Sequence, residues 1–232
     1  IGAKNAIDAG ADKICLPLSV SETHSQANLR KSHDEVLEEI RKISEYIEQL
    51  EKSQRPEFEG NLSTAFGCTL EGKVSEDLVL KLGARMMELG CDEIGLSDTT
   101  GYANPNQIKR LIRLLNKEVG QENLKSMHLH NTRGLGLANA LASLEEGITT
   151  LDSSLGGIGG CPFAPGASGN IVTEDLVFML DAMGVETGID INKLLEVTNK
   201  VQSFIPDESI YGFTKDSGLP IGYEKGWGIV RS

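Results

Sequence analysis

Two histidines are the residues of this sequence whose type and spacing most directly suggest chemistry. His128 and His130 stand two positions apart in an alternating segment, so both side chains point to the same face if the segment is a β-strand. Two imidazoles on one face near the end of a strand are a natural pair of ligands for a divalent metal ion. The same spacing also occurs in strands that bind no metal, so the pair alone leaves both interpretations open.

A second segment with chemical potential runs from Gly156 to Asn170. It contains six glycines, two prolines and one cysteine, Cys161. This composition forms neither a helix nor the interior of a strand. It predicts a loop that presents the thiol where a ligand could use it. Glycine-rich segments are also common as simple linkers, so this pattern is not decisive by itself.

Five short apolar segments alternate with amphipathic ones and predict the elements that position these residues. The expected strands span residues 13–18, 61–66, 93–97, 125–130 and 148–152. The segment 1–11 resembles the end of a helix, and further helices are expected over 33–54, 76–89, 134–146 and 190–204. Two more are expected to start at Pro105 and after Thr173. Residues 21–31 are expected to form a polar connection.

Several of these helices carry start signals. Ser32 with Glu35 three positions later predicts a capping box. Asn104 precedes a proline, which is a common first helical residue. Ser75 and Thr173 are expected to cap the helices that follow them.

Repeated strand-then-helix units predict a parallel α/β fold. A doubly wound sheet and a TIM-type (β/α)8 barrel both fit the spacing. Polar residues follow four successive strands, and in a barrel such loops converge on one face. The barrel is therefore favoured. A complete barrel needs about 250 residues and eight strands, so we expect the first strands to be missing from this chain, which would begin inside a larger protein. We expect residues 1–204 to hold the five barrel units and residues 205–232 to form a tail.

Composition excludes some partners. With a formal net charge of −12, the chain is not expected to bind nucleic acid or an anionic membrane through bulk electrostatics. No apolar run approaches the roughly 20 residues that span a bilayer. Four cysteines without Cys-x-x-Cys spacing indicate reduced thiols in a cytoplasmic enzyme.

These residues and motifs resemble the 3-hydroxy-3-methylglutaryl-CoA lyase family of metal-dependent lyase and synthase barrels. The resemblance extends from the first residue to about Phe204 and is strongest in the cysteine loop. It rests on residues 153–170, 173–177, 98–101, 128–130, 67–73, 9–12 and 192–196. Related synthases share the His-x-His motif but not the Cys-Pro loop, which speaks against a synthase.

The resemblance implies a divalent metal ion, Mg²⁺ or Mn²⁺, held by His128, His130 and Asn170. The family's remaining ligand is an aspartate on the first strand, beside a catalytic arginine. A substrate-binding glutamate follows on the second strand. No position of this chain matches these three residues.

The implied reaction is a retro-Claisen cleavage of 3-hydroxy-3-methylglutaryl-CoA to acetyl-CoA and acetoacetate. Cys161 is expected to act as the acid, Asp98 to position substrate or transfer a proton, and His128 to combine metal ligation with proton transfer. Substrate contacts are expected from four residues, namely Asp98, Arg133, Gly160 and Ser63. Cys68 and Glu71 are expected close to the site.

Other features remain open at this stage. His24 and His33 lie in polar connections and are expected to be exposed to solvent. Alternative functions are a lyase for a longer 3-hydroxy-3-alkylglutaryl-CoA, a Claisen-type synthase of the same superfamily, and a non-catalytic barrel. We expect a small-molecule acyl-CoA substrate and a homodimer or a higher homo-oligomer. The resemblance also implies a place in leucine catabolism and ketone body metabolism.

Overall fold

The computed structural model describes residues 1–160 and 169–226, which form two compact units. The first unit comprises residues 1–151, and the second contains residues 152–160 together with the described residues from 169 onward. Among the described residues, no helix is both long and apolar enough to cross a membrane. The two units divide near residue 151, whereas the tail was expected to begin after residue 204. The tail boundary stays a prediction.

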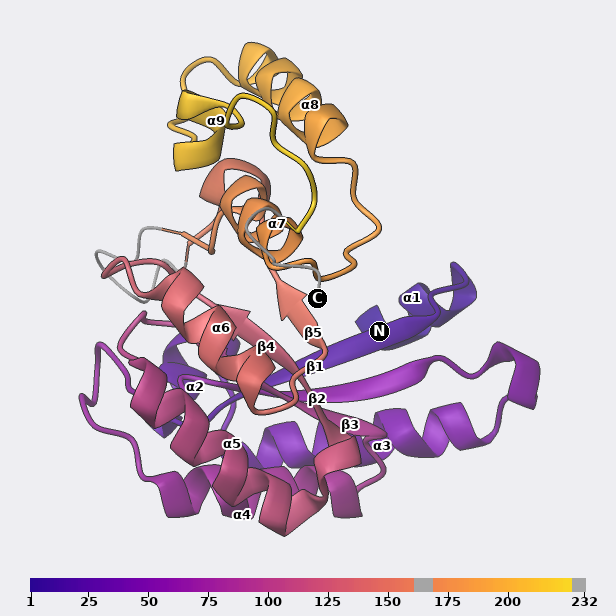
Figure 1. The fold of residues 1–232 in the computed structure, drawn as a ribbon. Coiled ribbons are helices and arrows are strands. Elements are labelled where there is room, and N and C mark those ends of the chain that lie inside the picture. The colour runs from indigo at the N-terminus through magenta and orange to yellow at the C-terminus, as the bar shows by residue number, and fades with distance from the viewer. Residues whose placement is uncertain (161–168, 227–232) are drawn as a thin grey trace, which may run out of the picture. The chain divides into compact units, whose positions relative to one another are not determined.

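A parallel sheet with strand order β1-β2-β3-β4-β5 organises the first unit (Figure 1). Its strands are β1 (Lys13–Ser19), β2 (Glu57–Ser63), β3 (Glu93–Asp98), β4 (Leu124–Leu129) and β5 (Thr150–Asp152). Adjacent strands are neighbours in sequence, and the pairings β1–β2, β2–β3 and β3–β4 are all parallel. The predicted parallel α/β architecture is therefore confirmed for the described chain.

Amphipathic helices supply the apolar side chains that cover this sheet. The first unit contains α1 (Gly2–Asp8), α2 (Glu22–Leu29), α3 (His33–Glu48), α4 (Glu76–Glu88), α5 (Pro105–Val119) and α6 (Gly136–Glu145). Short 3₁₀ turns occur at Lys52–Gln54 and Gln121–Asn123. Helices α3, α4 and α5 lie along one face of the sheet in Figure 1. Ile40, Leu111 and Met86 are fully buried between helices and strands, which removes apolar surface from water.

Two of the expected helix starts are confirmed in detail. Ser32 accepts from the backbone N–H of Glu35, and the Glu35 side chain accepts from the Ser32 N–H in return. Asn104 forms the equivalent reciprocal capping box at α5. Thr173 is not a cap, contrary to the prediction. It is the first residue of α7, and its hydroxyl donates instead to Ser153 Oγ at 2.9 Å.

The predicted position of the second strand is wrong. The strand occupies Glu57–Ser63 rather than 61–66, because its register against β1 pairs Lys13 with Glu57 and Ser19 with Ser63. The expected polar connection after β1 is also wrong, since it contains α2. Ser21 caps this helix by accepting from the His24 N–H at 3.1 Å.

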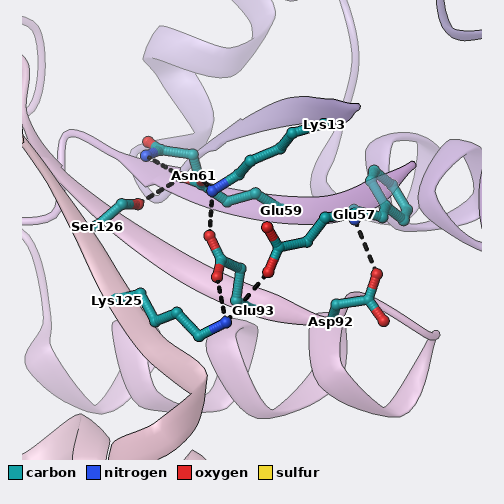
Figure 2. Close-up of polar contacts among 9 residues, drawn as sticks. Lys13, Glu57, Glu59, Asn61, Asp92, Glu93, Lys125 and Ser126 are labelled. Carbon is teal, nitrogen blue, oxygen red and sulfur yellow. Dashed lines mark hydrogen bonds and ion pairs between the residues drawn. The ribbon is translucent and has the colours of Figure 1, made fainter. Parts of the chain in front are cut away.

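A network of charged and polar side chains crosses strands β1 to β4 (Figure 2). Lys13 contacts Glu59 at 2.7 Å and also Glu93, which is only 1% exposed. Lys125 reaches Glu93 at 2.8 Å and Glu57 at 3.1 Å. A register shift between β3 and β4 leaves Lys125 without a partner residue in β3, and such a bulge re-aims a side chain.

In this network, ion pairing affects the pKa values of Lys13 and Glu93 more than burial does. Burial alone would lower the pKa of Lys13, but the hydrogen bonds and charges of Glu59 and Glu93 raise that pKa above its usual value. Burial would likewise raise the pKa of Glu93, and the two lysines lower it below its usual value. Both groups are therefore held in their charged forms, as buried ion pairs require.

The second unit contains the remaining helices and the tail. Its helices are α7 (Thr173–Ala182), α8 (Ile191–Phe204) and α9 (Phe213–Ser217), and a 3₁₀ turn covers Leu155–Gly157. Asp190 caps α8 by accepting from the backbone N–H groups of Asn192 at 3.1 Å and Lys193 at 3.2 Å. The described part of the tail, which ends at residue 226, contacts α7. Asp175 of α7 accepts from the N–H groups that begin α9, and Tyr223 stacks on Phe178 with ring centroids 5.3 Å apart.

We predict that Glu93→Ala destabilises the protein by about 1.5 to 3 kcal/mol, because it removes the charged hydrogen bonds to Lys13 and Lys125, which keep only Glu59 and Glu57 as partners. Chemical denaturation of the variant and the wild type measures the difference. Glu88→Ala is the matched control, since Glu88 pairs with Arg85 at 2.7 Å on the surface. That change is expected to cost at most about 0.5 kcal/mol. Equal effects of the two substitutions would contradict a structural role for the network.

Candidate functional site

The histidine pair lies at the carboxyl end of β4. His128 belongs to the strand and His130 follows it directly. Their Nε2 atoms are 3.2 Å apart, and the rings meet edge to face with centroids separated by 5.2 Å. Both side chains therefore lie on one face, as the alternation predicts. On the neighbouring strand, Ser97 is the register partner of His128.

This geometry fits two adjacent ligands of one metal ion. Adjacent nitrogens of an octahedral ion with bonds of about 2.1 Å are about 3.0 Å apart, close to the separation observed. Burial, followed by the charge of His128, lowers the pKa of His130 to about 4. A neutral imidazole keeps the lone pair that a metal ion needs. His130 Nδ1 is buried and has no hydrogen-bond partner among the described residues, so a further group is needed to satisfy it.

Polar side chains of β2 and β3 form a layer beside the histidines. Ser97 Oγ donates to Asn61 Oδ1 at 2.5 Å, and Asn61 Nδ2 donates to Glu59 at 3.3 Å. Ser126, two residues before His128, donates to the same Glu59 carboxylate at 2.6 Å. No sequence pattern predicts this chain of hydrogen bonds, because it depends on the register of three strands.

Asn170, the third expected ligand, lies in the second unit. Its Nδ2 donates to the carbonyl oxygen of Ile158 at 3.1 Å. Its Oδ1 is buried and has no partner among the described residues. An amide oxygen is a suitable ligand for Mg²⁺ or Mn²⁺. The side chain is thus oriented through its nitrogen and retains an unsatisfied oxygen.

Asp98 ends β3 and is 1% exposed. Its carboxylate accepts from the backbone N–H groups of Tyr102 at 2.9 Å and Ala103 at 3.1 Å. Burial raises the pKa of Asp98 to about 6, although these two donors and the charge of Arg133 lower it. Asp98 therefore both holds the loop after β3 and titrates near neutrality, where a proton-transfer group is effective.

Arg133 contacts the same loop. Its guanidinium donates to the carbonyl oxygens of Thr100 at 3.1 Å and Gly101 at 3.3 Å. It also lies over the ring of Tyr102, 4.5 Å from the centroid, in a cation–π arrangement. Tyr102 is a residue that the sequence did not single out. The loops after β3 and β4 are thereby joined, which brings Arg133 close to Asp98.

The other expected site residues lie at the end of β2, in the loop after it, or at the margin of the described chain. Ser63 is half-buried at the end of β2. Cys68 is buried, and its sulfur accepts from the Leu70 N–H at 3.3 Å. Glu71 accepts from the Thr23 N–H at 2.7 Å. Gly160 is exposed. Cys161 lies outside the described residues.

The expectation that His24 is solvent-exposed is wrong. His24 is 1% exposed, and its Nδ1 lies 2.8 Å from Ser19 Oγ. Burial lowers the pKa of His24, while the charge of Glu71 opposes that shift. His33 is half-buried, with Nε2 2.9 Å from the Ser19 carbonyl oxygen. Helix α2 was not predicted because its sequence is polar. It turns His24 toward the end of β1.

Within the described residues, no group of three or more His, Cys, Asp or Glu side chains is arranged to hold a metal ion. The histidine pair and Asn170 belong to different units, each described by itself. Their joint role in one site therefore stays a prediction.

Comparisons with known proteins place the chain in a family. A family model described as HMGL-like matches residues 2–201. Hydroxymethylglutaryl-CoA lyase YngG of Bacillus subtilis (strain 168) is 37% identical over 201 residues, which are 87% of this chain and 66% of that protein. The mitochondrial hydroxymethylglutaryl-CoA lyase of Homo sapiens is 38% identical over 85% of this chain and 59% of its own length. The chain thus spans about half to two thirds of the curated relatives it matches.

Solved structures are similar as well. An HMG-CoA lyase from Acinetobacter baumannii in complex with coenzyme A and 3-methylmalate has a TM-score of 0.87 and 39% identity, covering 96% of this chain and 71% of that one. The HMG-CoA lyase of Bacillus subtilis has a TM-score of 0.84 and 34% identity, covering 93% and 70%. These similarities confirm the predicted fold class and the family resemblance.

We predict that Asp98 makes the stability of the metal-free protein depend on acidity. Its folded pKa of about 6 lies above the usual 3.8, so the stability it contributes is complete below about pH 4. That stability is lost as the pH rises toward about 6. Relative to Asp98→Asn, wild type should lose about 2 to 3 kcal/mol of unfolding free energy across this interval.

Chemical denaturation at a series of pH values, with chelator present, measures this difference. Arg133→Leu should move the loss to higher pH, because the arginine charge lowers the pKa of Asp98. Arg113→Leu is the control, since Arg113 pairs with Glu146 on the surface. A pH-independent difference between wild type and Asp98→Asn would show that Asp98 has an ordinary pKa.

Proposed function

This chain belongs to the HMGL-like family, and from that premise we propose that it is part of a lyase that cleaves 3-hydroxy-3-methylglutaryl-CoA to acetyl-CoA and acetoacetate. The observation that carries the proposal is the histidine pair, with Nε2 atoms 3.2 Å apart and a neutral His130. The names of the relatives support the substrate. Coenzyme A bound in the Acinetobacter baumannii enzyme supports an acyl-CoA ligand.

We propose that His128, His130 and Asn170 hold Mg²⁺ or Mn²⁺. When bound, such an ion supplies Lewis-acid chemistry that lowers the pKa of a substrate hydroxyl. Two neutral imidazoles and one amide oxygen bring no charge to the ion, so they leave its positive charge available to an anionic substrate. The Oδ1 of Asn170 is buried and has no partner among residues 1–160 and 169–226, which supports its assignment as a ligand.

The proposed reaction moves one proton off the substrate and one proton onto the product. Asp98 accepts the proton of the C3 hydroxyl, directly or through His128, as the C2–C3 bond breaks. The electron pair of that bond passes to C2, which forms the enolate of acetyl-CoA. Cys161 donates the proton that converts this enolate to acetyl-CoA. A pKa of about 6 suits Asp98 to the first transfer.

Substrate contacts are proposed from residues near these groups. Arg133, already held against the loop after β3 by two carbonyl oxygens, would bind a carboxylate or the thioester oxygen. Ser63 and Gly160 complete the proposed contacts. Each of these residues would offer an N–H or O–H donor to a carboxylate or another polar group of the substrate.

We further propose that the protein works as a homodimer or a higher homo-oligomer. We place it in the cytoplasm, in leucine catabolism and ketone body metabolism. Cytoplasmic enzymes occur among the relatives, such as the 3-hydroxy-3-methylglutaryl-CoA lyase of Rattus norvegicus. A mitochondrial form is also known among them.

The first test is release of acetoacetate from 3-hydroxy-3-methylglutaryl-CoA by the full-length protein. We expect release with Mg²⁺ or Mn²⁺ and its loss with a chelator. Metal binding without release would contradict this substrate and favour a longer 3-hydroxy-3-alkylglutaryl-CoA. Neither release nor metal binding would contradict the lyase proposal altogether.

Two substitutions separate the acid from the metal site. Cys161→Ala should lower turnover by about 10² to 10⁴-fold, the usual contribution of a general acid, while Mn²⁺ affinity stays unchanged. His130→Ala should lose Mn²⁺ affinity as well as turnover. Steady-state kinetics and equilibrium dialysis measure the two effects. Cys15→Ala serves as the control for loss of a thiol. Unchanged turnover in Cys161→Ala would refute its assignment as the acid.

A further inference from the structure

A short part of the tail contacts the glycine-rich segment that carries Asn170. We call residues 210–214 the clamp segment. The family model matches residues 2–201 only, so the clamp segment lies beyond the matched region. All of its contacts described below lie within the second unit.

Gly156 is the point where the clamp segment makes contact. The backbone N–H of Tyr211 donates to the Gly156 carbonyl oxygen at 2.8 Å. On the other side, the Gly156 N–H donates to the buried Glu174 carboxylate, with distances of 3.0 and 3.2 Å to its oxygens. A Cβ added to Gly156 would lie 2.4 Å from Ile210 Cβ. The close approach leaves no room for a side chain, and Gly156 also has a positive φ of 57°.

Helix α7 binds both Gly156 and the clamp segment. Glu174 and Asp175 are consecutive residues in its first turn. Asp175 accepts from the N–H groups of Phe213 at 3.1 Å and Thr214 at 2.7 Å. The clamp segment is therefore attached to the same helical turn that binds Gly156. Thr198 of α8 donates to Glu174 and further fixes its carboxylate.

The turn that begins at Gly156 also orients Asn170. Two residues later, the Ile158 carbonyl oxygen accepts from Asn170 Nδ2 at 3.1 Å and from Ser154 Oγ at 2.6 Å. Gly157 and Gly169 run so close that a Cβ on Gly169 would lie 2.1 Å from the Gly157 carbonyl oxygen. The turn at Gly156 and the backbone next to Asn170 are therefore in direct contact.

We propose that the clamp segment positions Asn170: it fixes Gly156, so that the Ile158 carbonyl oxygen holds Asn170 Nδ2 and leaves Oδ1 directed away from that bond. The role of Oδ1 as a metal ligand rests on the proposed function, whereas the orientation of the amide does not. Partners that orient a ligand in this way typically affect metal affinity by about 10 to 100-fold when they are removed.

The test is a double-substitution cycle between Gly156 and Ile210 in the full-length protein. Gly156→Ala should push the clamp segment away, because its methyl group would overlap Ile210 Cβ. Alanine at a positive φ is also strained, whatever its neighbours. Ile210→Gly in the same chain removes the overlapping atoms without changing that strain. Recovery in the double variant therefore reports the clamp contact itself.

Two measurements follow the cycle. In the metal-free protein, the side-chain amide resonance of Asn170 and its hydrogen exchange report the bond to Ile158. Equilibrium dialysis with Mn²⁺ reports the ligand role. For Gly156→Ala we expect a shifted, faster-exchanging amide and about tenfold or greater loss of Mn²⁺ affinity. The double variant should recover the wild-type amide resonance and come within about threefold of the wild-type affinity. Ile221→Gly, at a fully exposed tail position, is the matched control and should change neither.

An unchanged Asn170 amide in Gly156→Ala, or no recovery in the double variant, would overturn the proposal. The two failures remain distinguishable. Absence of acetoacetate release by wild type refutes the proposed function, while the amide resonance still decides whether the clamp segment positions Asn170. A shifted amide with unchanged Mn²⁺ affinity would overturn the ligand role of Asn170 and uphold only the contact.

Discussion

Charge pairing inside the parallel sheet is the constraint on which the first unit depends. Glu93 is nearly inaccessible to water. Its negative charge is compensated by Lys13 of β1 and Lys125 of β4. A buried carboxylate without such partners would be far too costly to keep ionised. The strands must therefore keep the register that brings the lysines and carboxylates together. The same register sets Ser97 beside His128 at the carboxyl end of the sheet.

Burial then adjusts the chemistry of the groups at that end. It lowers the pKa of His130 to about 4 and raises that of Asp98 to about 6. One group therefore stays neutral with a lone pair available, and the other titrates close to neutrality. Arg133 donates a hydrogen bond to the loop that follows Asp98, and its guanidinium stacks on Tyr102. The proposed metal-binding pair and the proposed proton-transfer group thus lie at the carboxyl ends of neighbouring strands.

In the second unit, close backbone approaches and hydrogen bonds to two carboxylates decide the local arrangement. Gly156 approaches Ile210 Cβ, and Gly169 approaches the Gly157 carbonyl oxygen, too closely for a side chain at either glycine. These contacts bring the turn of Leu155–Gly157 against the strand-like segment that contains Asn170. The tail is attached to α7 through Asp175. A segment beyond the family match therefore takes part in holding a residue inside it.

Much of the fold was predictable from the sequence because it depends on local patterns. The apolar segments predicted five strands, the reciprocal caps at Ser32 and Asn104 were recognisable, and the alternation placed His128 and His130 on one face. The roles of Cys161 and Asn170 came from the family resemblance and stay predictions.

Tertiary structure alone decided what depends on residues far apart in the chain. β2 starts at Glu57, where its pairing with β1 begins, and its glutamates meet Lys13 of β1 and Lys125 of β4. His24 became buried because α2 packs it against Ser19. The pKa of Asp98 follows from burial that no local pattern reveals. Local periodicity specifies elements and faces, whereas charge pairing and desolvation act only once distant strands are brought into contact.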